Sequence, residues 1–184
     1  MLCLKLVGST EGICKMEIRE LRIEDAEQFL NLINTLDAET TFLLFEKGER
    51  KTTVEEEKEI FLKGKENGNI TFVVVEKGRL VGFVWGGIFT ENRRKHCLRI
   101  AIAILQESTG KGYGTKLMNA LEKEALKKGI TRFELDVSVK NKIAINLYKK
   151  MGFLIEGERK NSYLIDGEFD NDYIMAKIIE FPKK

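Results

Sequence analysis

The stretch with the clearest chemical potential is residues 108–117, which read Ser-Thr-Gly-Lys-Gly-Tyr-Gly-Thr-Lys-Leu. Glycines at 110, 112 and 114 let a bulky group approach the backbone, because they carry no side chain. The stretch precedes a helical pattern, so free N–H groups and the positive end of a helix dipole point outward there. This arrangement favours an anion. We predict that the loop holds a pyrophosphate without magnesium; the alternative is a tight turn that uses glycine only for its φ angles.

Two common phosphate-binding patterns do not fit this loop. The pattern G-x-x-x-x-G-K-[ST] would need a glycine at position 105 and a hydroxyl residue at position 112, but the chain has Leu105 and Gly112. The dinucleotide pattern G-x-G-x-x-G would need a glycine where the chain has Thr115 or Leu117. A nucleotide-binding protein therefore stays only as an alternative, which predicts binding of ATP or NAD and little binding of CoA.

A second pattern lies at 141–153. Five residues lie on one short expected helix and its exit: Asn141, Ala144, Tyr148, Gly152 and Phe153. The glycine loop and this second pattern, in this order and with a strand between them, resemble the GNAT-type N-acetyltransferases, which use acetyl-CoA. The resemblance extends over nearly the whole chain, from about Met16 to Ile179.

The resemblance implies a site for acetyl-CoA. The amides of the loop would hold its pyrophosphate, and backbone groups of Ile102 and Ile104 would bind the pantetheine arm like an added strand. Thr109 stands where the family has Gln or Arg, so backbone amides are expected to provide the contacts at that position. The residues expected to contact the cofactor are Ile102, Ile104, Thr109, Gly110, Lys111, Gly112, Tyr113, Gly114, Thr115, Asn141, Ala144 and Tyr148.

The resemblance also implies the chemistry, which is direct attack of a neutral amine on the thioester in a ternary complex. Such a reaction needs a base for the amine and a proton for the leaving thiolate. Tyr148 matches the family's tyrosine beside the cofactor sulfur and is the expected proton donor. For the base, Glu39 is a candidate on the loop that borders the acceptor site; Glu134, Asp136, His96 and water are the others.

The acceptor stays open between a polyamine, an amino acid, an aminoglycoside-like amine and a protein N-terminus. Glu39, Glu46 and Glu49 near the expected acceptor mouth would suit a cationic amine. The rival interpretation is a domain that binds acyl-CoA without catalysis, as a sensor or partner module. Family members are often dimers, so the resemblance leaves a homodimer open.

Period-two and helical patterns predict the elements that must position these residues. Strands are expected at 16–22, as two in 70–90 joined at 76–79, at 96–105, at 130–139, and as two in 153–179 around Asp166-Gly167. Helices are expected at 23–36, 52–68, 113–129 and 141–152. The fold class is α/β (α+β): a GNAT-like, mixed, mostly antiparallel twisted sheet of six to seven strands, flanked by about four helices. The strand–helix–strand unit 98–137 should be parallel and right-handed.

Composition and charge limit which other classes of protein are compatible with this sequence. The 184 residues with 43% hydrophobic and 33% charged residues suit a soluble globular protein. We expect a loosely held extension at 1–15 and a single domain at 16–184. The net charge of +2 argues against nucleic-acid binding, and no apolar run is long enough for a membrane span. The cysteines Cys3, Cys14 and Cys97 indicate a reducing compartment, hence the cytoplasm, and no metal site is expected.

Overall fold

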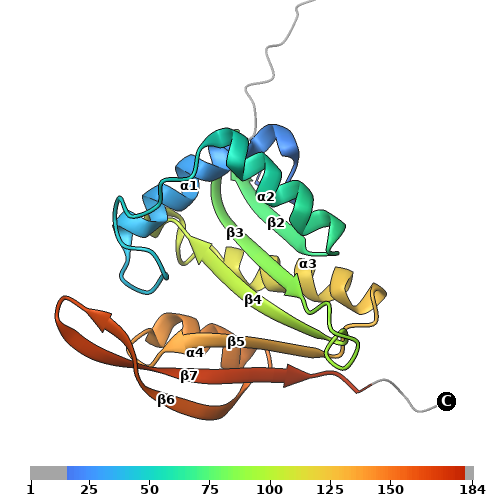
Figure 1. Ribbon diagram of the computed structural model, residues 1–184, viewed down its shortest axis with the longest axis vertical. Coiled ribbons are helices and arrows are strands. Elements are labelled where there is room, and N and C mark those ends of the chain that lie inside the picture. The colour runs from blue at the N-terminus through green and yellow to red at the C-terminus, as the bar shows by residue number, and fades with distance from the viewer. Residues whose placement is uncertain (1–15, 181–184) are drawn as a thin grey trace, which may run out of the picture.

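One seven-stranded sheet organises the computed structural model, which describes residues 16–180 (Figure 1). Its strand order is β1-β2-β3-β4-β5-β7-β6. The strands are β1 (Glu17–Glu20), β2 (Ile70–Glu76), β3 (Arg79–Ile88), β4 (Cys97–Ile104), β5 (Arg132–Ser138), β6 (Leu154–Ile165) and β7 (Glu168–Ile178). The helices are α1 (Ala26–Glu39), α2 (Val54–Glu66), α3 (Tyr113–Lys127) and α4 (Lys142–Lys150), with short 3₁₀ turns η1 (Ile23–Asp25) and η2 (Gln106–Ser108). The expected extension at 1–15 lies outside the described residues.

The predicted fold class is confirmed. Every neighbouring pair in the sheet is antiparallel except β4 and β5. That parallel pair is the one predicted for the unit that crosses over through α3. Both predicted hairpin turns are present, and their central residues Lys77-Gly78 and Asp166-Gly167 have positive φ, as tight two-residue turns require.

Helices cover both faces of the sheet. Phe83 on β3 packs edge-to-face on Phe29 of α1, with ring centroids 5.3 Å apart. Gly86 lies three positions further along β3 and therefore faces the other side, where Leu121 of α3 is fully buried. A side chain at Gly86 would come within 2.8 Å of Leu121, so this glycine lets α3 approach the sheet.

Local hydrogen bonds determine where α2 begins, and a tertiary ion pair helps to determine where α1 ends. Helix α2 begins with the capping box predicted from Thr53 and Glu56: the Thr53 Oγ1 accepts from the Glu56 N–H, and the Glu56 carboxylate accepts from the Thr53 N–H. Helix α1 extends to Glu39, beyond the apolar pattern that predicted an end at 36. Buried Asp37 pairs with Arg50 at 2.9 Å, and this tertiary contact stabilises the extra turn.

The sheet opens into a fork between β4 and β5. The two strands pair only from Cys97–Arg99 to Arg132–Glu134 and then diverge toward their carboxyl ends (Figure 1). Strand β4 stays paired to β3 as far as Ile104. The Leu105 N–H donates to the Val81 carbonyl at 2.9 Å, so by alternation the backbone groups of Ile102 and Ile104 point away from β3, into the fork.

Candidate active site

A cavity of about 510 Å³ occupies the fork. This is the size of a small-molecule site. One wall is β4 (Ile100–Ile104), the opposite wall is formed by the end of β5 and by α4, and the end of α1 with the following residues 40–44 closes a third side. The predicted residues that line the cavity are Glu39, Ile102, Ile104, Thr109, Asp136, Asn141, Ala144 and Tyr148.

The glycine loop presents an open backbone at the start of α3. Gly110 and Gly112 have φ values of +75° and +76°, in the left-handed region that favours glycine. A Cβ at either position would meet no atom within 4 Å, so the space beside the backbone is free. Helix α3 begins at Tyr113, and the N–H groups of its first turn have no partner within the helix. An anion can therefore reach several backbone donors at once.

The side chains of the loop are bound to Glu76 at the end of β2. The Lys111 Nζ lies 2.9 Å from the Glu76 carboxylate, Tyr113 Oη donates to it at 3.0 Å, and Ser108 Oγ donates at 3.1 Å. The hydrogen bond from Lys111 and then that from Tyr113 lower the pKa of the Glu76 carboxyl. The side chains of Lys111 and Tyr113 thus fix the loop to the sheet through Glu76.

Tyr148 projects from α4 into the fork. Its side chain is buried, with 6% exposed, and packs on Phe153 with ring centroids 5.9 Å apart. Tyr148 lines the cavity, and burial alone, with no hydrogen bond among the described residues, acts on its phenol. Burial raises its pKa, so the phenol keeps its proton and can donate a hydrogen bond to a group in the cavity.

Asn141 caps α4 at the entrance of the same cavity. Its Oδ1 accepts from the Ala144 N–H at 3.1 Å, which fixes the side chain and holds the first turn of the helix. The Nδ2 group is the other half of this amide and is a donor. Asn141 can therefore serve as a cap and as a ligand contact together.

Of the predicted bases, two line the cavity and two do not. Glu39 lies on the last turn of α1, not on the loop where it was expected, and its carboxylate accepts from the Gln106 N–H at 2.9 Å. Asp136 lines the wall formed by β5. Glu134 and His96 lie outside the cavity wall, and Glu134 is paired with Arg94 at 2.6 Å.

Fewer carboxylates than predicted surround the opening of the cavity. Glu46 and Glu49 are absent from the cavity wall. The Glu46 N–H donates to the Glu49 carboxylate at 2.8 Å, which closes a turn in the connection between α1 and α2. Only Glu39 of these three carboxylates reaches the fork.

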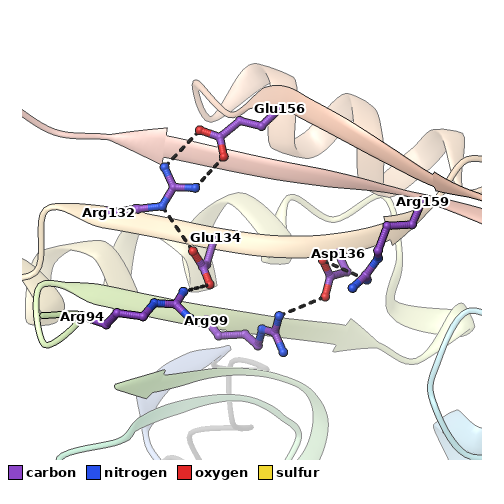
Figure 2. A network of polar contacts seen from close by, with 7 residues as sticks. All are labelled: Arg94, Arg99, Arg132, Glu134, Asp136, Glu156 and Arg159. Carbon is purple, nitrogen blue, oxygen red and sulfur yellow. Dashed lines mark hydrogen bonds and ion pairs between the residues drawn. The ribbon is translucent and has the colours of Figure 1, made fainter. Parts of the chain in front are cut away.

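A network of charged side chains lies beside the cavity, and the sequence did not predict it. Arg132, Glu134 and Asp136 alternate along β5 (Figure 2). Their partners outside β5 are Arg94, in the connection before β4, and residues of β4 and β6. Asp136 lies 3.4 Å from Arg99 and 3.1 Å from Arg159, and Arg159 also binds the fully buried Asp172. The alternation on β5 is visible in the sequence, but the partner residues on β4 and β6 are set by the strand order.

Neither a metal cluster nor a membrane helix occurs in the described part of the chain. Among residues 16–180, no group of three His, Cys, Asp or Glu side chains is placed to hold a metal ion. Within the same range, no helix is long and apolar enough to cross a membrane. Cys97 is buried at the start of β4 with a free thiol, as expected for a strand cysteine.

Comparison with known protein families shows which family has this fold and this cavity. Residues 27–153 match the model of the acetyltransferase (GNAT) family. The chain belongs to the GNAT acetyltransferase family. The matched range contains α1 from Glu27 on, the fork, the glycine loop and α4, so every residue of the cavity wall except Tyr163 and Ile165 of β6 lies within it.

Solved structures of GNAT acetyltransferases have the same fold. A GNAT acetyltransferase from Streptococcus pneumoniae is 28% identical, with a TM-score of 0.86 over 90% of this chain and 100% of that one. The ribosomal-protein-alanine N-acetyltransferase of Brucella melitensis is 21% identical, with a TM-score of 0.80 over 89% and 99%. The phosphinothricin acetyltransferase of Sinorhizobium meliloti, solved with acetyl-CoA, is 17% identical, with a TM-score of 0.80 over 89% and 88%. The resemblance that the two sequence patterns predicted is confirmed.

Proposed function

We propose that this GNAT chain transfers the acetyl group of acetyl-CoA to a primary amine by direct attack in a ternary complex. The observation that supports this function is the fork cavity, where the free backbone of β4 and the buried phenol of Tyr148 line one space. The open amides of the glycine loop lie at the start of α3, next to β4 in the chain. If the pyrophosphate of acetyl-CoA binds at the start of α3, its pantetheine arm can extend along β4 toward Tyr148.

Acetyl-CoA fits the fork through backbone groups more than through side chains. The amides of its pantetheine arm can pair with Ile102 and Ile104, whose N–H and C=O groups have no strand partner on the open side. Thr109 and Asn141 border the same space. The residues proposed to contact the cofactor are Ile102, Ile104, Thr109, Gly110, Lys111, Gly112, Tyr113, Gly114, Thr115, Asn141, Ala144 and Tyr148.

The reaction needs two proton transfers. The nitrogen lone pair of the neutral amine attacks the thioester carbon, and the C–S bond breaks as the carbonyl reforms. Tyr148 gives a proton to the leaving thiolate, for which its protonated state is suited. Glu39 takes a proton from the amine through its free carboxylate oxygen, since the other oxygen is bound to Gln106.

The wall of the cavity favours an apolar amine as acceptor. It contains the carboxylates of Glu39 and Asp136, and no Lys, Arg or His among its described residues. Exposed Phe42, Leu44 and Ile143 surround the opening. The carboxylate of a free amino acid would meet no cation in this wall, and a polyamine would meet few further carboxylates. We therefore favour an alkyl or aralkyl amine, or a protein N-terminus with an apolar first residue.

A homodimer is the proposed assembly. Strand β6 lies at the edge of the sheet, is twelve residues long and exposes Leu154, Ile155 and Leu164. An edge strand with unpaired backbone groups and apolar side chains suits pairing with a second copy. Light scattering tests this, and Leu154→Lys should shift a dimer toward the monomer.

Ligand binding and turnover together test the function. Thermal unfolding is measured with acetyl-CoA, CoA, ATP or NAD, and a ligand of the native state raises the melting temperature by mass action. Shifts with acetyl-CoA and CoA alone are expected, followed by release of CoA thiol when phenethylamine or a peptide with an N-terminal Met-Leu is added. A shift with acetyl-CoA but no thiol release with any amine would support the non-catalytic sensor instead. A shift only with ATP or NAD would overturn the assignment of the loop.

A further inference from the structure

A second cavity, of about 430 Å³, lies between α2, the end of β1 and strands β2 and β3. It shares no lining residue with the fork cavity. Its wall contains the aromatic rings of Phe29, Phe61 and Trp85 together with several polar side chains. Its size is within the range of small-molecule sites.

Glu57, on the first turn of α2, is the least exposed of the three carboxylates that line this cavity. It lies on α2, is 7% exposed and lines this cavity. Within residues 16–180 no fully buried side-chain oxygen lacks a hydrogen bond, so the unbonded carboxylate of Glu57 opens onto the cavity. Arg50 is the one charge that lowers its pKa, but the Arg50 guanidinium is bound to Asp37, and burial, the larger effect, raises the pKa of Glu57. The carboxylate loses part of its hydration in this cavity, so a cation that enters from outside can stabilise its charge.

Trp85 offers a flat aromatic surface to the same cavity. The next residue but one on β3 is Gly87, where a Cβ would come within 2.2 Å of the Trp85 ring. The glycine therefore allows the indole to lie along the strand. Trp85 therefore lines the cavity with its ring, and its indole N–H is a donor.

We propose that this cavity binds a small organic cation, with its ammonium group at Glu57 and its alkyl groups on Trp85 and Phe61. Aromatic faces and a buried carboxylate together select positive charge over a neutral molecule of the same shape. The other charged side chains of the cavity are Glu20, Glu124, Lys65 and Lys128, and Glu124 is paired with Lys127, so Glu57 carries the attraction for a cation. An anion would approach the unpaired carboxylate and is disfavoured. The site is separate from the fork and does not depend on acetyl transfer.

Trp85 makes the test direct, because it is the single tryptophan of the chain. Choline is titrated into the full chain without acetyl-CoA, and the tryptophan emission is recorded. The matched probe is 3,3-dimethyl-1-butanol, which has the shape of choline without its charge. A saturable change with choline and at least about tenfold weaker binding of the alcohol are expected, because only the cation gains the charged contact with Glu57.

Two variants locate the effect. Glu57→Gln keeps the size and polarity of the side chain and removes its charge, and it should weaken choline binding by at least about tenfold. Glu59→Gln removes an exposed carboxylate two residues away on the same helix and should bind choline as the parent does. Circular dichroism confirms the folding of both variants. Equal binding of the alcohol, equal binding by Glu57→Gln, or no saturable change with choline would each overturn the proposal.

Discussion

The carboxylate of Glu39 accepts a hydrogen bond from the backbone N–H of Gln106 at 2.9 Å. Glu39 ends α1, and Gln106 begins the η2 turn that leads into the glycine loop. Both residues line the fork cavity. This bond therefore joins the wall next to the proposed acceptor to the segment that is proposed to hold the cofactor.

Two substitutions separate the charge of Glu39 from its role as a hydrogen-bond acceptor. Glu39→Gln keeps an oxygen for the Gln106 N–H but cannot take a proton, so kcat should fall by about 10²-fold while the Kd of acetyl-CoA stays unchanged. Glu39→Ala also loses the bond to Gln106 and should weaken acetyl-CoA binding in addition. Steady-state kinetics and calorimetric titration of the two variants provide the measurement. Full kcat in the Gln variant would make Glu39 a residue that only positions the loop.

The phenol of Tyr148 is predicted to act through its proton. Tyr148→Phe keeps the ring that packs on Phe153 and should leave the melting temperature and the Kd of acetyl-CoA unchanged. Its kcat should fall by about 10²-fold or more, because the thiolate then leaves without a donor. Since burial raises the pKa of the phenol above its ordinary value near 10, the parent's rate should show no loss from Tyr148 ionisation up to that pH. An unchanged kcat in the Phe variant would leave Tyr148 a packing residue.

Glu76 should control cofactor affinity without contacting the cofactor. Its carboxylate binds the side chains of Ser108, Lys111 and Tyr113, so Glu76→Ala frees three residues of the loop at once. The Kd of acetyl-CoA should rise about tenfold or more, because the amides lose their preset positions. Glu107→Ala removes an exposed pair with Arg79 close to the same loop and should change the Kd less than about twofold. Similar values for the two variants in calorimetric titration would contradict the role of Glu76.

The sequence predicted the elements well, because each one has a strong local signal. Alternating apolar residues on the strands, the capping box at Thr53 and Glu56, and the turns at Lys77-Gly78 and Asp166-Gly167 are all short-range patterns. The end of α1 was wrong by three residues. Its last turn depends on Asp37 and Arg50, which are thirteen positions apart, and no helical period records such a contact.

The site was predictable where the backbone forms it and not where distant side chains meet. Gly110 and Gly112 indicated a loop with an open backbone, and both have the positive φ that only glycine adopts easily. That this loop binds an anion stays a prediction. The orientation of Lys111 toward Glu76 depends on the end of β2, which lies 35 positions earlier in the chain. The cavity beneath α2 was missed for a related reason. Glu57 stands in a run of three glutamates, and only the packing of α2 on the sheet shows that it is the buried one.

Glu57 also predicts how stability depends on pH. Burial raises its folded-state pKa above the ordinary value of 4.5, so the proton is held more tightly in the folded chain than in the unfolded one. The stabilising contribution of the protonated group is complete below 4.5 and is lost as the pH rises through the folded-state pKa. Glu57→Gln is neutral at every pH, so it should melt above the parent at pH 7.5, and the difference should shrink toward pH 4. Scanning calorimetry of the parent, Glu57→Gln and the exposed control Glu59→Gln measures this. A Glu57→Gln variant that melts below the parent at pH 7.5 would mean that the ionised carboxylate is stabilised within the fold itself.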